Sequence, residues 1–88
     1  MSEPLSPATK EFGARIRARR EQLGWSQEKA ADACHIHWTY LGRAERGTLS
    51  PSLNNILKIA YGLQIDPGQL VKGLKPSKGQ IRTTRPKS

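Results

Sequence analysis

Residues 27–47 decide the fold, and they read Gln27-Glu-Lys-Ala-Ala-Asp-Ala-Cys-His-Ile-His-Trp-Thr-Tyr-Leu-Gly-Arg-Ala-Glu-Arg-Gly47. Ser26, just before this stretch, is a favourable helix N-cap because its side-chain oxygen can accept a backbone N–H. A break at residues 35–37 separates a first short helix from a second one, which we expect to end at Gly47. Two helices joined by roughly three or four residues form a helix-turn-helix unit, whose second helix can lie in a DNA major groove.

The inward positions of both helices carry small or aliphatic side chains. Ala30, Ala31 and Cys34 share one face of the first helix, where their size lets another helix approach closely. In the second helix Leu41 and Ala44 point inward. The other positions of the second helix point away from the core, toward a ligand or solvent. They are Trp38, Thr39, Gly42, Arg43 and Arg46.

A cap residue followed by proline predicts the start of each of the three other helices. Proline is tolerated at the first helical position, and the pairs are Ser6-Pro7, Ser50-Pro51 and Asp66-Pro67. We expect helices over residues 7–23 and 51–62 and a short fifth helix from residue 67. The first of them has an apolar stripe of Phe12, Ile16 and Leu23. The inward set of the fourth helix is Leu53, Ile56, Ile59, Ala60 and Leu63, and the fifth helix carries Leu70, Val71 and Leu74. With no strand pattern, the fold class is all-α, a compact bundle of five helices.

Length and charge limit the class of protein further. An 88-residue chain with 35% hydrophobic content allows one domain with a modest core, and a net charge of +8 favours an anionic partner. Residues 75–88 hold five of the fifteen Lys and Arg residues and no acid, which indicates nucleic acid more than a membrane. We assign residues 1–8 to a flexible lead, 9–74 to the folded domain and 75–88 to a disordered basic tail. The tail serves either DNA binding or solubility through Lys75, Lys78, Arg82, Arg85 and Lys87.

Several classes are disfavoured. A single cysteine forms no internal disulfide, and no apolar run reaches the roughly 20 residues of a transmembrane helix, so we expect a cytoplasmic, nucleoid-associated protein. We expect no enzymatic activity and no cofactor, because the chain has neither a phosphate-binding glycine loop nor a base partner for Cys34. Cys34, His35 and His37 invite a zinc hypothesis, but their spacing is poor and no further cysteine or histidine follows, so we predict no metal.

Several linked motifs carry a family resemblance. They are Ser26-Gln27-Glu28 with Ala30-Ala31, Thr39-Tyr40-Leu41-Gly42, Glu45-Arg46-Gly47, Ser50-Pro51-Ser52-Leu53 and Lys58-Ile59-Ala60. Over about residues 11–74 the chain resembles the Cro/repressor-like (XRE-type) helix-turn-helix family. The resemblance implies a five-helix, lambda-repressor-like DNA-binding domain of a transcription regulator, usually dimeric.

The resemblance also implies roles for single residues. Trp38, Thr39 and Arg43 match positions that face base edges, and Arg43 would bind guanine O6 and N7. The positions that usually meet the DNA backbone are Gln27, Tyr40, Arg46, Thr48 and Ser52. Arg20 and Glu45 match a buried structural ion pair. His35 departs from the glycine usual in the turn, and histidine tolerates the left-handed region better than most residues.

Three functions remain open at this point. The first is a sequence-specific regulator of the repressor or restriction-modification controller type, a homodimer that binds a pseudo-palindromic double-stranded operator without membrane contact. Its dimer surface is expected from apolar residues beyond core needs, namely Leu57, Tyr61, Ile65, Val71 and Leu74. The second is an antitoxin that binds a toxin and represses its own operon. The third is a non-specific nucleoid binder.

Overall fold

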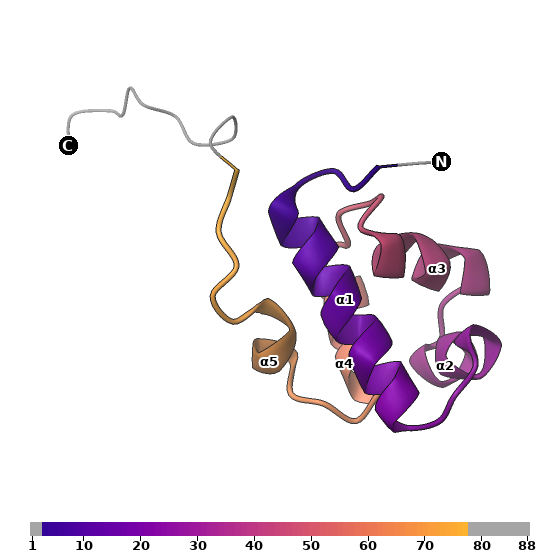
Figure 1. Ribbon diagram of the computed structural model, residues 1–88. Coiled ribbons are helices and arrows are strands. Elements are labelled where there is room, and N and C mark those ends of the chain that lie inside the picture. The colour runs from indigo at the N-terminus through magenta and orange to yellow at the C-terminus, as the bar shows by residue number, and fades with distance from the viewer. Residues whose placement is uncertain (1–2, 78–88) are drawn as a thin grey trace, which may run out of the picture.

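A computed structural model describes residues 3–77, and the predicted tail lies outside these residues from residue 78 onward. The predicted all-α fold with five helices is confirmed. The helices are α1 (Pro7–Gln22), α2 (Gln27–Cys34), α3 (Trp38–Arg46), α4 (Leu53–Gly62) and α5 (Pro67–Val71). In Figure 1, α1 crosses in front of α4, with α2 and α3 on one side and α5 on the other. Helix α1 packs against α3 and α5, while α2 packs against α3 and α4.

Helix α1 begins where the cap-plus-proline signal predicts. The Ser6 hydroxyl accepts the Thr9 N–H at 3.1 Å, and the Thr9 hydroxyl accepts the Ser6 N–H at 3.0 Å, so two backbone donors at the helix start are satisfied. Residues 7 and 8 therefore belong to the first helix, although the boundary given above placed them in the lead. Leu5 N–H and the Thr9 hydroxyl both donate to the Gly47 carbonyl, which joins this end of α1 to the end of α3.

The predicted start of the fourth helix is wrong. Helix α4 begins at Leu53 rather than Pro51, because Ser52 and not Ser50 is the N-cap, accepting the Asn55 N–H at 3.2 Å. Leu53 was also expected to point inward. It occupies the first turn, at the end of the helix, and 71% of it is exposed.

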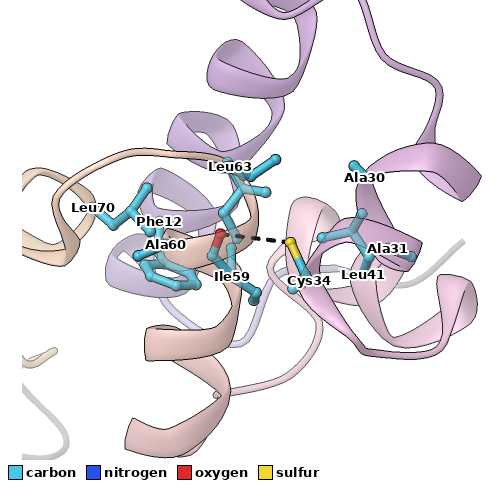
Figure 2. Packing of buried hydrophobic residues seen from close by; sticks show 11 residues of the cluster. Phe12, Ala30, Ala31, Cys34, Leu41, Ile59, Ala60, Leu63 and Leu70 are labelled. Atoms are coloured by element: carbon cyan, nitrogen blue, oxygen red, sulfur yellow. Dashed lines mark hydrogen bonds between the residues drawn. The ribbon is translucent and has the colours of Figure 1, made fainter.

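The core lies where α1, α2, α3 and α4 meet. Ile16, Leu41, Ile59 and Leu63 are fully buried there, and Trp25 packs against this cluster as a partly buried residue. Figure 2 shows Cys34 beside α4, where its thiol donates to the Ile59 carbonyl at 3.5 Å. Gly62 permits this close packing, because a Cβ atom added at this position would lie only 2.6 Å from the Cys34 Cα.

Two arginines of α1 hold the ends of α4 and α5. Arg19 donates to the carbonyls of Leu63 and Gln64, at 2.8 and 3.1 Å, just beyond the end of α4. Arg15 donates to the Lys72 carbonyl at 2.8 Å, beyond the end of α5. Carbonyls at helix C-termini lack intrahelical partners and attract cations. Arg15 and Arg19 thus fix the ends of α5 and α4 to α1.

Candidate nucleic-acid interface

The turn between α2 and α3 closes through a left-handed residue. His35 has φ 58° and ψ 42°, and its N–H donates to the carbonyls of Ala31 and Asp32. The next N–H, of Ile36, also donates to the Ala31 carbonyl at 3.1 Å. This is the arrangement that usually uses glycine, so histidine accepts the conformation as the sequence predicted.

Helix α3 starts with a histidine cap that sequence analysis missed. His37 Nδ1 accepts the Thr39 N–H at 3.1 Å and lies 2.7 Å from the Thr39 hydroxyl. The imidazole also stacks on Trp38, with ring centroids 5.7 Å apart and planes 25° apart. An Xaa-His-Xaa-Thr pattern after a turn offers little signal, because serine, threonine, aspartate and asparagine are the usual caps.

The three predicted base-contact residues share the outward side of α3. Trp38, Thr39 and Arg43 are exposed, whereas Leu41 and Ala44 on the opposite side are buried. The Arg43 guanidinium has no hydrogen-bond or ion-pair partner among residues 3–77. The exposed side of this helix thus carries donors, a methyl group and an aromatic ring in one short stretch.

The residues predicted to contact the DNA backbone lie in two places, beside α3 and just beyond its end. The ends of the Gln27 and Arg46 side chains both lie next to Gly42 of α3. A Cβ atom added at Gly42 would lie 3.6 Å from Gln27 Oε1 and 3.3 Å from Arg46 Nη1. Tyr40 is half-buried on the same helix. Beyond the helix, the Thr48 hydroxyl donates to the Arg43 carbonyl at 3.2 Å.

Ser52 stands apart from the others as the N-cap of α4. Its oxygen accepts the Asn55 N–H, and the side chain is exposed. Residues 48–52 therefore form a loop that links the end of α3 to a helix start, and helix starts favour anions.

Arg20 and Glu45 form the predicted ion pair, and its geometry is bidentate. Arg20 Nε lies 2.6 Å from Glu45 Oε2, and Arg20 Nη2 lies 3.0 Å from Glu45 Oε1. The two side chains are 13% and 3% exposed. Gln27 Nε2 donates to the same carboxylate at 3.0 Å, and Arg20 Nη1 donates to the Trp25 carbonyl at 2.9 Å. The hydrogen bonds to Glu45 raise the pKa of Arg20 above its ordinary value.

This network ties α3 to both preceding helices. Glu45 lies in α3, Arg20 in α1 and Gln27 at the first position of α2, so one buried carboxylate fixes the orientation of the exposed helix. The Gln27 amide, which the family resemblance assigned to contact with the DNA backbone, donates to Glu45 and so also braces α3 within the protein.

The remaining arginines of α1 are already engaged within the fold. Arg17 pairs with Glu21 at 3.1 Å, Arg15 and Arg19 bind the helix ends described above, and Arg15 also pairs with Glu11. Sequence analysis missed the capping role of Arg15 and Arg19. Their four-residue spacing, which places both on one helix face, was the available signal.

Cys34 is buried in the core. Burial raises the pKa of the Cys34 thiol to about 11, which keeps it protonated at neutral pH. Within residues 3–77 no three His, Cys, Asp or Glu side chains gather as metal ligands. In the same residues no helix is both long and apolar enough to cross a membrane.

A short helix pair with an exposed, donor-rich second helix defines a helix-turn-helix protein of the DNA-binding class. The chain belongs to the helix-turn-helix family, whose model, described as "Helix-turn-helix", matches residues 16–70. The resemblance to the Cro/repressor-like regulators is confirmed, and the chain is a DNA-binding transcriptional regulator.

Relatives and solved structures agree with this assignment. The chain is 43% identical over 61 residues to the control protein C.BamHI of Bacillus amyloliquefaciens, covering 68% of this chain and 75% of that protein. It is similar to the restriction-modification controller protein C.AhdI from Aeromonas hydrophila, with a TM-score of 0.69, 42% identity and coverage of 70% and 94%. The P22 c2 repressor, solved with a synthetic operator, has a TM-score of 0.66 and 32% identity, with coverage of 70% and 94%.

Proposed function

We propose that this regulator binds double-stranded DNA sequence-specifically, with α3 in the major groove. One observation carries the proposal. Among the arginines of residues 3–77, only Arg43 and Arg46 have a guanidinium group without a hydrogen-bond or ion-pair partner, and both lie in α3. The fold thus satisfies the other four arginines internally and leaves two for an external anion or acceptor.

Arg43 is the proposed base reader. Its guanidinium can donate two parallel hydrogen bonds to O6 and N7 of a guanine, the most common specific contact in the major groove. Trp38 and the Thr39 methyl lie on the same exposed side of α3 and suit contact with a thymine methyl. These three side chains supply specificity.

The proposed backbone contacts surround this reading face. Gln27 and Arg46 lie together over Gly42, and Thr48 and Ser52 follow the end of α3. Tyr40 is half-buried on α3 with a hydroxyl that can reach a phosphate. Contacts to phosphate fix the register of the protein on DNA and give most of the sequence-independent affinity.

Among regulators of this family, we infer a controller of the restriction-modification type. The likeness to C.BamHI covers three quarters of that protein, and the likeness to C.AhdI covers 94% of that chain, so this short chain matches such controllers over most of their length. The P22 c2 likeness supports the broader repressor class.

Binding by Arg43 is tested with a fluorescence anisotropy titration. A duplex selected by the protein from a random pool is compared with a scrambled duplex at about 150 mM salt. We expect wild type to prefer the selected duplex by about 10³-fold or more. Arg43→Ala should narrow this gap by roughly five- to 150-fold, because a bidentate pair is worth about 1–3 kcal/mol.

Arg17→Ala is the matched control, because this substitution removes the same charge from a residue of α1 that is 64% exposed and pairs with Glu21. It should leave the ratio of the two affinities unchanged. Equal binding of both duplexes by wild type would contradict sequence-specific recognition.

We also propose that the protein acts as a homodimer through α4 and α5. Leu57, Tyr61 and Val71 are exposed apolar residues there, and Tyr61 is 83% exposed, while Ile65 and Leu74 of the predicted set are partly buried against the core. Tyr61 also borders two surface grooves, one with Cys34 and one with Trp25. Exposed apolar side chains of this kind favour a partner, and a two-fold dimer matches a pseudo-palindromic operator.

Sedimentation equilibrium of the full chain tests the dimer. Wild type should sediment as a dimer at micromolar concentration, and Tyr61→Glu should shift it toward monomer because a charge would be buried in the interface. Arg17→Glu, a charge change at an exposed position of α1 and so outside the proposed α4 and α5 surface, is the control and should preserve the dimer. A monomeric wild type that still binds the operator cooperatively would contradict the proposal.

A further inference from the structure

The contact between His37 and Thr39 determines which group donates and which accepts at His37 Nδ1 and at the Thr39 hydroxyl. The Thr39 backbone N–H can only donate, so His37 Nδ1, at 3.1 Å, must be the acceptor. A neutral imidazole with Nδ1 as acceptor carries its hydrogen on Nε2. The Thr39 hydroxyl lies 2.7 Å from the same Nδ1, and this contact is favourable only if the hydroxyl donates. The single hydroxyl proton of Thr39 is thereby used inside the protein.

We propose that His37 fixes Thr39 as a pure hydrogen-bond acceptor toward DNA. This inference rests on the proposed function, because it requires α3 to face base edges. A threonine hydroxyl can ordinarily donate or accept and so binds many base edges. With its proton directed at Nδ1, Thr39 keeps only oxygen lone pairs for the exposed side. It therefore reads amino groups, which in the major groove are adenine N6 and cytosine N4.

The structure also holds His37 in the orientation that this role requires. The imidazole stacks on Trp38, with 5.7 Å between ring centroids, while its Nδ1 caps the helix. Both contacts restrict rotation of the ring, so Nδ1 stays directed at Thr39. His37 acts here as a positioning residue, and Thr39 makes the contact with the base.

The test uses single-atom changes in a duplex selected by the full chain from a random pool. Each adenine in turn is replaced by purine, which lacks the 6-amino group, and each cytosine by 2-pyrimidinone, which lacks the 4-amino group. At one position of each half-site, wild type should lose affinity by roughly three- to tenfold, the range for one hydrogen bond. Thr39→Val, which keeps the branched shape and removes the hydroxyl, should not respond to the amino group at that position.

Two His37 variants separate positioning from a merely structural role. In His37→Asn, Oδ1 takes the place of Nδ1, so both the cap and the dependence on the amino group should persist. In His37→Ala the Thr39 hydroxyl proton no longer has Nδ1 as its acceptor and can be donated elsewhere. The loss of affinity on removal of the amino group should then fall below about twofold. If His37→Ala weakened all duplexes equally and kept the full dependence, His37 would serve only as a cap and the proposal would be overturned.

Failure of the inference differs from failure of the proposed function. If wild type binds selected and scrambled duplexes alike, both are overturned. If wild type discriminates between them but responds to no amino group, or if Thr39→Val responds as wild type does, only the assignment of Thr39 as an acceptor is overturned. Both of these results come from proteins with an intact His37 cap.

Discussion

At the scale of single residues, the buried carboxylate of Glu45 decides how α3 is held. It receives three hydrogen bonds, two from Arg20 and one from Gln27, and its side chain is 3% exposed. Removing Arg20 would leave this charge buried with only the Gln27 amide beside it. We predict that Arg20→Ala lowers the free energy of unfolding by about 3–5 kcal/mol, measured by urea denaturation monitored by circular dichroism.

The matched comparison for this prediction is Arg17→Ala on the same helix. Arg17 and Glu21 are both more than half exposed, and exposed pairs contribute about 0–1 kcal/mol. Its urea midpoint should stay close to that of wild type. A similar small loss for Arg20→Ala would show that the pair is solvated rather than buried.

At the scale of helices, α1 and α3 approach so closely that glycine is required between them. A Cβ at Gly13 would overlap the carbonyl oxygens of Ala44 and Glu45 at the end of α3. Backbone carbonyls cannot move aside as a side chain can. We predict that Gly13→Ala costs about 1–3 kcal/mol of stability, because the helices must separate.

Gly42, also within a helix, provides the opposite case. A Cβ there meets only the ends of the flexible Arg46 and Gln27 side chains. Gly42→Ala should therefore keep or increase stability by up to about 1 kcal/mol, since alanine favours helix. Both predictions are checked by measuring the thermal unfolding of the two variants. A Gly13→Ala protein as stable as Gly42→Ala would contradict the close approach of α1 to α3.

Capping signals predicted most of the helix order, and the exceptions have physical reasons. Ser6, Ser26 and Gly47 act where the sequence placed them. Ser50-Pro51-Ser52 contains two possible caps, and local propensity could not choose between them. The capping arginines depend on tertiary contacts more than 40 residues away in sequence, such as Arg19 with Leu63, which periodicity cannot reveal.

In the candidate site too, some features could be predicted from the sequence and others depend on side-chain contacts in the folded protein. Position-by-position resemblance placed Trp38, Thr39 and Arg43 on one helix, and the structure exposes all three. It could not show that the His37 imidazole binds Thr39, because that contact depends on side-chain rotamers and on a cap residue outside the usual set. Sequence patterns therefore predict which residues lie on the exposed side of α3, whereas the hydrogen bonds among those residues are seen only in the structure.

At the scale of the whole molecule, helices α1, α2, α4 and α5 form a scaffold that presents α3. Their contacts satisfy four arginines internally and leave Arg43 and Arg46 available on α3. The net charge of +8 favours any nucleic acid, so affinity alone cannot demonstrate sequence reading. The central claim is that Arg43 binds a guanine edge in the major groove.

The most direct measurement replaces each guanine of the selected duplex in turn with 7-deazaguanine, which lacks the N7 acceptor. Binding of wild type and Arg43→Ala is then compared by anisotropy. We predict that one guanine in each half-site weakens wild-type binding by roughly three- to tenfold when replaced, and that Arg43→Ala is insensitive at that position. Equal sensitivity of both proteins, or none in wild type, would contradict base reading by Arg43.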